Sequence, residues 1–162
     1  MTITEARRET KYTHTPRIAL VSHDTTREAL IELLREFLPE LHECSIVATQ
    51  ATGTMCKQLL GLPIEILTSS VKGGDILLGA LVVEGKVDAV IFIKDPFVPM
   101  AWDPTPLTIM RACDMYDVPI ATNIATARAI LSEIRMGLKA ERASGAKDGA
   151  AQSAVSVMET VA

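Results

Sequence analysis

The sequence predicts one α/β domain with a Rossmann-like, three-layer fold and a five-stranded parallel sheet. Three observations support this prediction. Short apolar runs alternate five times with segments that have the apolar spacing of helices. Each apolar run ends in a polar, turn-forming segment. A length of 162 residues with 48% hydrophobic content is enough for one packed core but too little for two domains of ordinary size.

The predicted strands and helices alternate along the chain. The strands are expected at residues 17–22, 45–49, 64–67, 87–93 and 118–122. The helices are expected at residues 30–38, 55–60, 76–85, from 107 onward, and at 125–138 with Asn123 as the cap. Residues 50–53 are predicted to form a polar turn. Because right-handed crossovers place all loops that follow parallel strands at one edge of the sheet, a ligand is expected there.

Both ends of the chain are predicted to lie outside this domain, which spans residues 17–138. Residues 1–16 are polar and are expected to form a flexible leader. Residues 139–152 are rich in Ala, Gly, Ser and charge, which is typical of a linker. Residues 153–162 carry apolar residues at i, i+3, i+4 and i+7, so a short amphipathic helix is predicted. The apolar positions are Ala154, Val157, Met158 and Val161.

Such a helix is too short to be stable alone, so it needs a partner or stays disordered. One interpretation is docking on a neighbouring subunit. The other is a resemblance to the peptides that target enzymes to shell proteins of bacterial microcompartments, in which case the helix folds on a groove of its partner.

Composition excludes several function classes. The net charge of −4 and the isoelectric point of about 5.4 argue against a nucleic-acid partner, because phosphate backbones are bound by a surplus of Lys and Arg. The three cysteines, Cys44, Cys56 and Cys113, have no C-x-x-C spacing, so neither a disulfide framework nor a metal site is indicated. No apolar run has the length of a membrane span, and no membrane partner is expected. A cytoplasmic protein is predicted.

A polar segment after the third strand is the strongest candidate for an anion-binding site. Ser69, Ser70, Gly73 and Gly74 lie in a turn that opens a helix, and such a turn presents backbone N–H groups and the positive end of the helix dipole. Asp75 lies at the start of this helix. It is either the N-cap residue or a carboxylate that acts beside a bound anion, and position alone favours the cap.

Other polar residues follow the remaining strands and are expected to share this edge. They are His23, Asp24, Thr49, Thr52, Gly53, Asp95, Thr122 and Asn123. Each has an ordinary structural explanation as a cap or turn residue. Three carboxylates that converge with a histidine on an anion-binding turn are less ordinary, because like charges at close range raise a pKa and prepare a base. The set predicts acid–base chemistry on a phosphate ester.

The same segments resemble the methylglyoxal synthase-like superfamily. The resemblance rests on residues 18–24, Ala48-Thr49 with Thr52-Gly53, residues 73–75, 79–80 and 84–88, Asp95-Pro96, and residues 119–126, and it spans about residues 17–131. It implies a five-stranded parallel fold and assembly into homohexamers. It also implies conversion of dihydroxyacetone phosphate to methylglyoxal and phosphate, without a metal or organic cofactor.

The resemblance implies a role for each matching residue. Asp75 resembles the base that removes a proton next to the substrate carbonyl, and His23 the histidine that orients or polarises the substrate oxygens. Asp24 and Asp95 resemble acidic residues of the active-site network. The phosphate cradle is matched by Thr49, Thr52, Gly53, Ser69, Ser70, Gly73 and Gly74, with Arg27 where the family commonly has lysine.

The chain departs from the family pattern within this site. Gln50 and Ala51 replace a glycine and a hydroxyl residue, and Val71 and Lys72 change the turn before Asp75. Trp102 and Thr105 stand where the family has a histidine and an aspartate with catalytic roles. The family's C-terminal arginine has three candidate counterparts, Arg128, Arg135 and Arg142.

These departures leave two function classes open. The first is a lyase, either methylglyoxal synthase or a diverged enzyme that acts on another small phosphorylated or carboxylated substrate. The second is a non-catalytic module that binds an anionic effector, as the same fold does in carbamoyl phosphate synthetase.

Overall fold

The computed structural model describes residues 14–97 and 105–160, with side chains for residues 14–97 and 107–143. In this part of the chain five parallel strands form one sheet in the order β3-β2-β1-β4-β5. The strands are β1 (Arg17–Ser22), β2 (Ser45–Ala48), β3 (Ile64–Ile66), β4 (Ala89–Ile93) and β5 (Ile120–Ala121).

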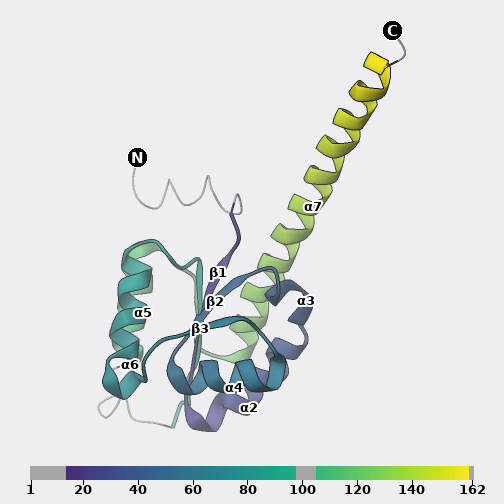
Figure 1. Ribbon diagram of the computed structural model, residues 1–162. Coiled ribbons are helices and arrows are strands. Elements are labelled where there is room, and N and C mark those ends of the chain that lie inside the picture. The colour runs from purple at the N-terminus through teal and green to yellow at the C-terminus, as the bar shows by residue number, and fades with distance from the viewer. Residues whose placement is uncertain (1–13, 98–104, 161–162) are drawn as a thin grey trace.

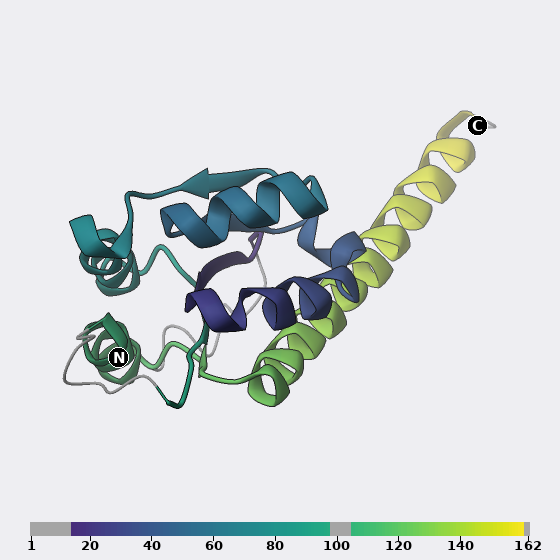
Figure 2. The same ribbon diagram turned by 90° about the horizontal axis from the view of Figure 1, so that it is seen from below.

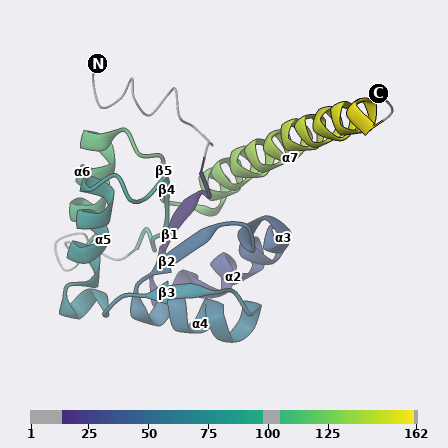
Figure 3. The same cartoon turned by 45° about the horizontal axis from the view of Figure 1, so that its top comes forward.

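Helices cover both faces of the sheet (Figure 1). One face is covered by α2 (Arg27–Arg35), α3 (Leu38–Leu41), α4 (Gln50–Leu60) and the first part of α7 (Ile124–Thr160). The other is covered by α5 (Gly74–Val83) and α6 (Thr105–Tyr116). Single 3₁₀ turns, η1 (Asp24–Thr26) and η2 (Ser70–Lys72), precede α2 and α5. Figure 3 shows the strands between the two helical layers, and the predicted three-layer α/β fold is confirmed.

The core has two halves because successive side chains of a strand point to opposite faces. In β1, Ile18 and Leu20 pack toward α2, α4 and α7, whereas Ala19 and Val21 pack toward α5 and α6. All five residues of β4 are buried, as expected of a strand that is covered on both faces.

The chain reverses direction across the sheet between β1 and β4. From β1 it adds β2 and β3 on one side, and then returns to add β4 and β5 on the other. In parallel α/β sheets the crevice for ligands lies outside the carboxyl ends of the strands at such a switch point. The loops after β1 and β4 flank it here.

The predicted polar turn at residues 50–53 is wrong, because this segment is the first turn of α4. Thr49 is the extended N-cap residue, with φ −64° and ψ 154°. The backbone N–H of Gly53 donates to the Thr49 carbonyl at 2.8 Å, which closes the first helical turn. Helical hydrogen bonding therefore overrides the turn preference of a Thr-Gly pair.

The flexible leader predicted at residues 1–16 extends too far toward the domain. Residues 1–13 lie outside the described part, but His14 and Pro16 contact the domain. The Nε2 atom of His14 lies 3.0 Å from the Asp88 carboxylate, and the Pro16 carbonyl accepts a hydrogen bond from the N–H of Ser45 at 2.9 Å.

The predicted linker at residues 139–152 is also wrong, because α7 runs without a break from Ile124 to Thr160. Residues 139–143 include Lys, Ala, Glu and Arg, which are strong helix formers, and Arg142 pairs with Glu43 beside α3. The separate helix predicted at 153–162 is thus, as far as residue 160, the end of α7. Figures 1 and 2 show this C-terminal part extending away from the body of the domain.

No helix in the described part of the chain is both long enough and apolar enough to cross a lipid bilayer.

Candidate active site

The turn between β3 and α5 is tightly folded around the carbonyl of Ser69. This carbonyl accepts hydrogen bonds from the N–H groups of Lys72 and Gly74, each at 2.9 Å. Gly73 has a φ of 89°, which favours glycine. A Cβ atom on Gly74 would lie 2.1 Å from the Thr68 carbonyl oxygen, so no side chain fits there. Both glycines are therefore required to bring the start of α5 against the loop.

Asp75 occupies the first turn of α5 and is not its cap. The N-cap residue is Gly73, and the structure shows no side-chain cap for this helix. Asp75 is only 7% exposed, and no donor among the described residues is bonded to its carboxylate. Buried carboxylates are normally hydrogen-bonded. The capping explanation thus fails, and the carboxylate is available to a ligand at the positive end of the helix.

His23 follows β1 and is held by the loop after β4. The backbone N–H of Asp95 donates to the Nδ1 atom of His23 at 2.9 Å. The imidazole also packs edge-on against Phe92, with ring centroids 5.4 Å apart. Because Nδ1 accepts a hydrogen bond, a neutral ring carries its proton on Nε2. The arrangement favours an imidazole that donates a hydrogen bond through Nε2.

Asp95 is kept ionised by its neighbours. The hydroxyl of Thr25 donates to one carboxylate oxygen at 2.7 Å, and the N–H of Phe97 donates to the other at 2.8 Å. These hydrogen bonds, that of Thr25 above all, lower the pKa of Asp95 below its usual value. The loops after β1 and β4 are thereby joined across the switch point.

The loop after β2 is fastened to β1 by a buried pair of hydroxyl groups. The Oγ1 atom of Thr52 accepts a hydrogen bond from the N–H of Ser22 at 3.1 Å and lies 3.1 Å from the Ser22 hydroxyl. Thr52 is fully buried, and Gly53 packs against the sheet, where a Cβ would lie 3.1 Å from the Cβ of Ala48. Thr52 and Gly53 are therefore buried in the first turn of α4, where they join this helix to β1 and β2, and their role in a phosphate cradle stays a prediction.

Of the residues predicted to bind phosphate, Thr49 and the turn at Ser69 lie at the carboxyl edge of the sheet. The N–H of Gln50 donates to the Thr68 carbonyl at 3.4 Å, which joins the loops after β2 and β3. Thr49 is 4% exposed and its hydroxyl makes no capping bond. Ser69 and Ser70 are partly exposed. Hydrogen bonds thus join the loops that follow β3, β2, β1 and β4, each to the loop of the neighbouring strand.

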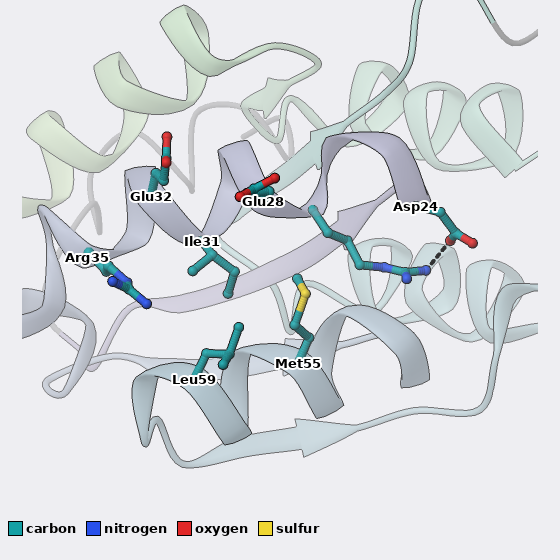
Figure 4. A pocket seen from close by; sticks show the side chains of 8 residues that line it. Asp24, Glu28, Ile31, Glu32, Arg35, Met55 and Leu59 are labelled. Atoms are coloured by element: carbon teal, nitrogen blue, oxygen red, sulfur yellow. Dashed lines mark hydrogen bonds and ion pairs between the residues drawn. The ribbon is translucent and has the colours of Figure 1, made fainter.

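Asp24 and Arg27 are paired with each other beside this edge. The Arg27 guanidinium is bonded to the Asp24 carboxylate, whose side chain is 86% exposed. Both residues also line a groove between α2 and α4 with a volume of about 480 Å³ (Figure 4). The remaining lining residues are Glu28, Ile31, Glu32, Arg35, Met55 and Leu59. Arg27 thus lines this groove while it is paired with Asp24.

The three candidate C-terminal arginines each form an ion pair with a glutamate that follows α2 or belongs to the α3 region. These pairs are Arg128 with Glu36, Arg135 with Glu40, and Arg142 with Glu43. They join α7 to the rest of the domain.

Two positions at which the chain departs from the family pattern are not fully described. Trp102 lies outside the described part, and of Thr105 only the backbone is described, as the first residue of α6. Among the described residues no three His, Cys, Asp or Glu side chains are grouped as a metal site would need. Cys44 and Cys56 are buried, and burial raises the pKa of each thiol to about 11, so neither is suited to act as a nucleophile.

Sequence reasoning missed Ser22 and Thr25 as site residues. Ser22 ends β1 and Thr25 lies in η1, and both hydroxyls bond to groups of neighbouring loops. A sequence signal existed, because both flank His23 after the strand that the switch point adjoins. Their partners, 30 and 70 residues away, could not be read from the sequence.

The fold and the site together define a class of protein. It is a parallel α/β domain whose carboxyl edge carries a buried carboxylate, an oriented imidazole and a glycine turn at a helix N-terminus.

Comparison with known proteins identifies the family within this class. The MGS-like domain family matches residues 29–122. Methylglyoxal synthases from Burkholderia mallei (strain SAVP1) and Burkholderia pseudomallei (strain 668) are each 42% identical over 126 residues, which are 78% of this chain and 97% of each relative. The crystal structure of methylglyoxal synthase from Elizabethkingia anophelis NUHP1 superposes with a TM-score of 0.65 at 30% identity, covering 73% of this chain and 78% of that one. The chain belongs to the MGS-like domain family and is similar to its lyases.

Proposed function

We propose that this protein is a carbon–oxygen lyase that eliminates phosphate from dihydroxyacetone phosphate and yields methylglyoxal. The buried carboxylate of Asp75 at the N-terminus of α5, to which no donor of the described residues is bonded, is the observation that carries the proposal. The 42% identity to methylglyoxal synthases over nearly their whole length supports the same reaction class.

The proposed reaction begins with Asp75 as the base. Its carboxylate accepts a proton from the hydroxymethyl carbon next to the substrate carbonyl, and the electron pair of that C–H bond forms an enediolate. His23 donates a hydrogen bond from Nε2 to the developing oxyanion. The proton of the hydroxyl group on the deprotonated carbon moves to the former carbonyl oxygen, and the enediolate then expels phosphate by breaking the C–O bond of the other carbon. The leaving phosphate takes up the proton from Asp75. The enol that remains moves its hydroxyl proton to the methylene carbon and becomes methylglyoxal.

The N-terminus of α5 and the Ser69 turn are the proposed phosphate site. Backbone N–H groups at a helix N-terminus bind anions without any metal ion or organic cofactor. Thr49, Ser69 and Ser70 supply hydroxyl groups at the same edge, and Gly74 permits close approach. Arg27 adds positive charge once it leaves Asp24. Asp95 holds the His23 ring and takes no proton itself.

Trp102 and Thr105 make a diverged substrate the main alternative within the lyase class. A phosphate-release assay with dihydroxyacetone phosphate and a panel of small phosphate esters tests the proposal. Release from dihydroxyacetone phosphate with formation of methylglyoxal is the expected result. Release only from another ester indicates a diverged lyase, whereas binding of phosphate esters without turnover indicates an effector-binding module.

A double substitution separates these outcomes further. Trp102→His combined with Thr105→Asp restores the two residue types of the family at this loop. If this variant releases more phosphate from dihydroxyacetone phosphate than the wild type, the chain is a synthase with a retuned loop. An unchanged rate means that the rest of the pocket has changed as well.

A cytoplasmic location is part of this proposal, because the substrate class is a phosphorylated metabolite. Placement inside a bacterial microcompartment depends on the C-terminal part of α7. Fusing residues 146–162 to a fluorescent carrier and measuring co-purification with shell proteins tests this placement. A carrier that stays free excludes targeting by this segment.

A further inference from the structure

The hydrogen bonds that pair β1 with β4 end at His23. Ser22, the last residue of β1, is in register with Ile93, the last residue of β4. One residue further, the backbone N–H of His23 donates to the Ile93 carbonyl at 3.2 Å. Beyond this bond the two chains separate, one into η1 and the other into the loop after β4. The position of that loop beside His23 therefore depends on contacts other than those of the sheet.

The hydroxyl group of Thr26 lies at the point where the two chains separate. It donates a hydrogen bond to the Ile93 carbonyl at 2.7 Å and lies 3.1 Å from the His23 carbonyl oxygen. A carbonyl oxygen has two lone pairs, so that of Ile93 accepts both this hydroxyl and the N–H of His23. The side chain of Thr26 thereby joins η1 to the end of β4.

Helix capping does not explain this hydroxyl group. Thr26 is the N-cap residue of α2, and threonine is common at that position because its oxygen accepts a backbone N–H. Here the backbone of Thr26 has φ −107° and ψ −1°, and the side chain makes no capping bond. Its hydroxyl bonds instead to a residue 67 positions along the chain. The contact belongs to the junction of β1 with β4, and not to α2.

We propose that Thr26 is a positioning residue for His23, a role that rests on the proposed lyase reaction. Asp95 follows Ile93 by two residues, and its N–H donates to the Nδ1 atom of the imidazole at 2.9 Å. Because Thr26 holds Ile93 against His23, it fixes the start of the segment that carries this N–H. The bond to Nδ1 then keeps the proton of the neutral ring on Nε2, where the proposed reaction needs a donor.

Thr25 holds the same segment at a second point. Its hydroxyl donates to the Asp95 carboxylate at 2.7 Å, so adjacent residues of η1 hold both ends of residues 93–95. If the Thr26 hydroxyl is removed, the Ile93 carbonyl keeps the N–H of His23 as a donor, and the strands stay paired. Loss of this hydroxyl is therefore expected to move the segment beside the imidazole without unfolding the sheet.

Thr26→Ser and Thr26→Ala in the full-length protein are a matched pair, because the two variants differ only by the hydroxyl group. Two-bond proton–nitrogen NMR correlation spectra, recorded at a pH that keeps the ring neutral, show which ring nitrogen of His23 carries the proton. The spectrum of His23→Asn identifies these signals among those of the three histidines. Circular dichroism and the thermal midpoint verify that each variant folds.

The wild type and Thr26→Ser are expected to carry the proton on Nε2. In Thr26→Ala the fraction with the proton on Nδ1 is expected to rise about fivefold, the factor that corresponds to one typical hydrogen bond. Its kcat is expected to be about tenfold below that of Thr26→Ser, with KM values within about twofold, because the substituted residue orients the donor and does not bind the substrate.

Equal tautomer fractions in Thr26→Ser and Thr26→Ala overturn the inference, as do equal kcat values in a protein that turns over the substrate. A wild type whose neutral His23 carries its proton on Nδ1 overturns it without any variant. The NMR measurement needs no substrate. A wild type without turnover therefore contradicts the proposed reaction, while the tautomer fractions still decide whether Thr26 orients the ring.

Discussion

At the scale of single residues, the chemistry of the site depends on how His23 and Asp95 hold each other. Asp95 gives its backbone N–H to the imidazole, while its carboxylate is occupied by Thr25 and Phe97. These hydrogen bonds lower the pKa of the Asp95 carboxyl group and make it a weaker base than an unbonded aspartate. The different roles proposed for the two carboxylates follow from their surroundings. Asp75 is buried without a bonded donor among the described residues, whereas Asp95 accepts two hydrogen bonds.

Replacing Thr25 by valine is expected to raise the pKa of Asp95, because the hydroxyl of Thr25 is the largest cause of its lowered value. A carboxyl titration followed by NMR measures this change. Thr54→Val on the exposed surface of α4 is the matched control and leaves the titration of Asp95 as in the wild type.

The same substitution has a predictable effect on stability against pH. A carboxyl group whose pKa is lower in the folded than in the unfolded chain stabilises the fold above the unfolded value, and this contribution is lost as the pH falls through the folded value. Wild type and Thr25→Val are therefore expected to differ at neutral pH and to converge as the pH falls from the ordinary pKa of 3.8 through the lowered pKa of Asp95. An equal difference at all pH values contradicts the assigned role of Thr25.

At the scale of elements, the turn into α5 is fixed by backbone geometry. Gly74→Ala is expected to destabilise the protein by about 1–3 kcal/mol or more, because the added methyl group collides with backbone atoms. Gly79→Ala is the control in the same helix. Its Cβ would meet only a methyl group of Thr108 at 3.8 Å, so a gain of up to about 1 kcal/mol is expected.

Urea unfolding of both glycine variants gives the free energies of unfolding. If Gly74→Ala unfolds at the same urea concentration as the wild type, the turn between β3 and α5 can accept a methyl group at position 74, and this glycine does not fix the position of Asp75.

The elements also show which features a sequence can predict. The strands were predictable because a buried parallel strand needs a continuous apolar run, as β4 has. The cap at Asn123 is confirmed, since its side chain accepts the N–H of Thr126 at 3.0 Å. The linker at 139–152 was predicted wrongly because Gly and Ser outweighed the Lys, Ala, Glu and Arg beside them. The buried hydroxyl of Thr52 is hydrogen-bonded to Ser22, which lies 30 residues away in the chain, and this pairing cannot be predicted from composition.

At the scale of the whole molecule, α7 has two parts with different roles. Its first part supplies Leu131, Ile134 and Leu138 to the core, and its ion pairs reach as far as Arg142. The later part extends away from the body (Figure 1). About a fifth of the chain has no counterpart in the Burkholderia relatives, which are matched over 97% of their length.

Deleting residues 144–162 is therefore expected to leave the stability of the domain nearly unchanged. Leu138→Ala, in contrast, removes a core side chain that is 6% exposed and is expected to cost about 2–5 kcal/mol. Thermal unfolding compares the two variants. A deletion that lowers the midpoint as much as Leu138→Ala contradicts the division of α7 and indicates that the end of the helix packs on the protein.

In the proposed reaction, Asp75 removes the proton that starts phosphate elimination. Asp75→Asn changes one proton acceptor with little change in volume. Asp117→Asn is the isosteric control: it alters an exposed aspartate whose φ of 53° asparagine also accepts.

The most direct measurement is phosphate release from dihydroxyacetone phosphate by these two variants and the wild type, together with binding of inorganic phosphate. We expect that Asp75→Asn loses a factor of about 10²–10⁴ or more in turnover, still folds and still binds phosphate, while Asp117→Asn behaves as the wild type. Turnover by Asp75→Asn close to that of the wild type would contradict the assignment of Asp75 as the base.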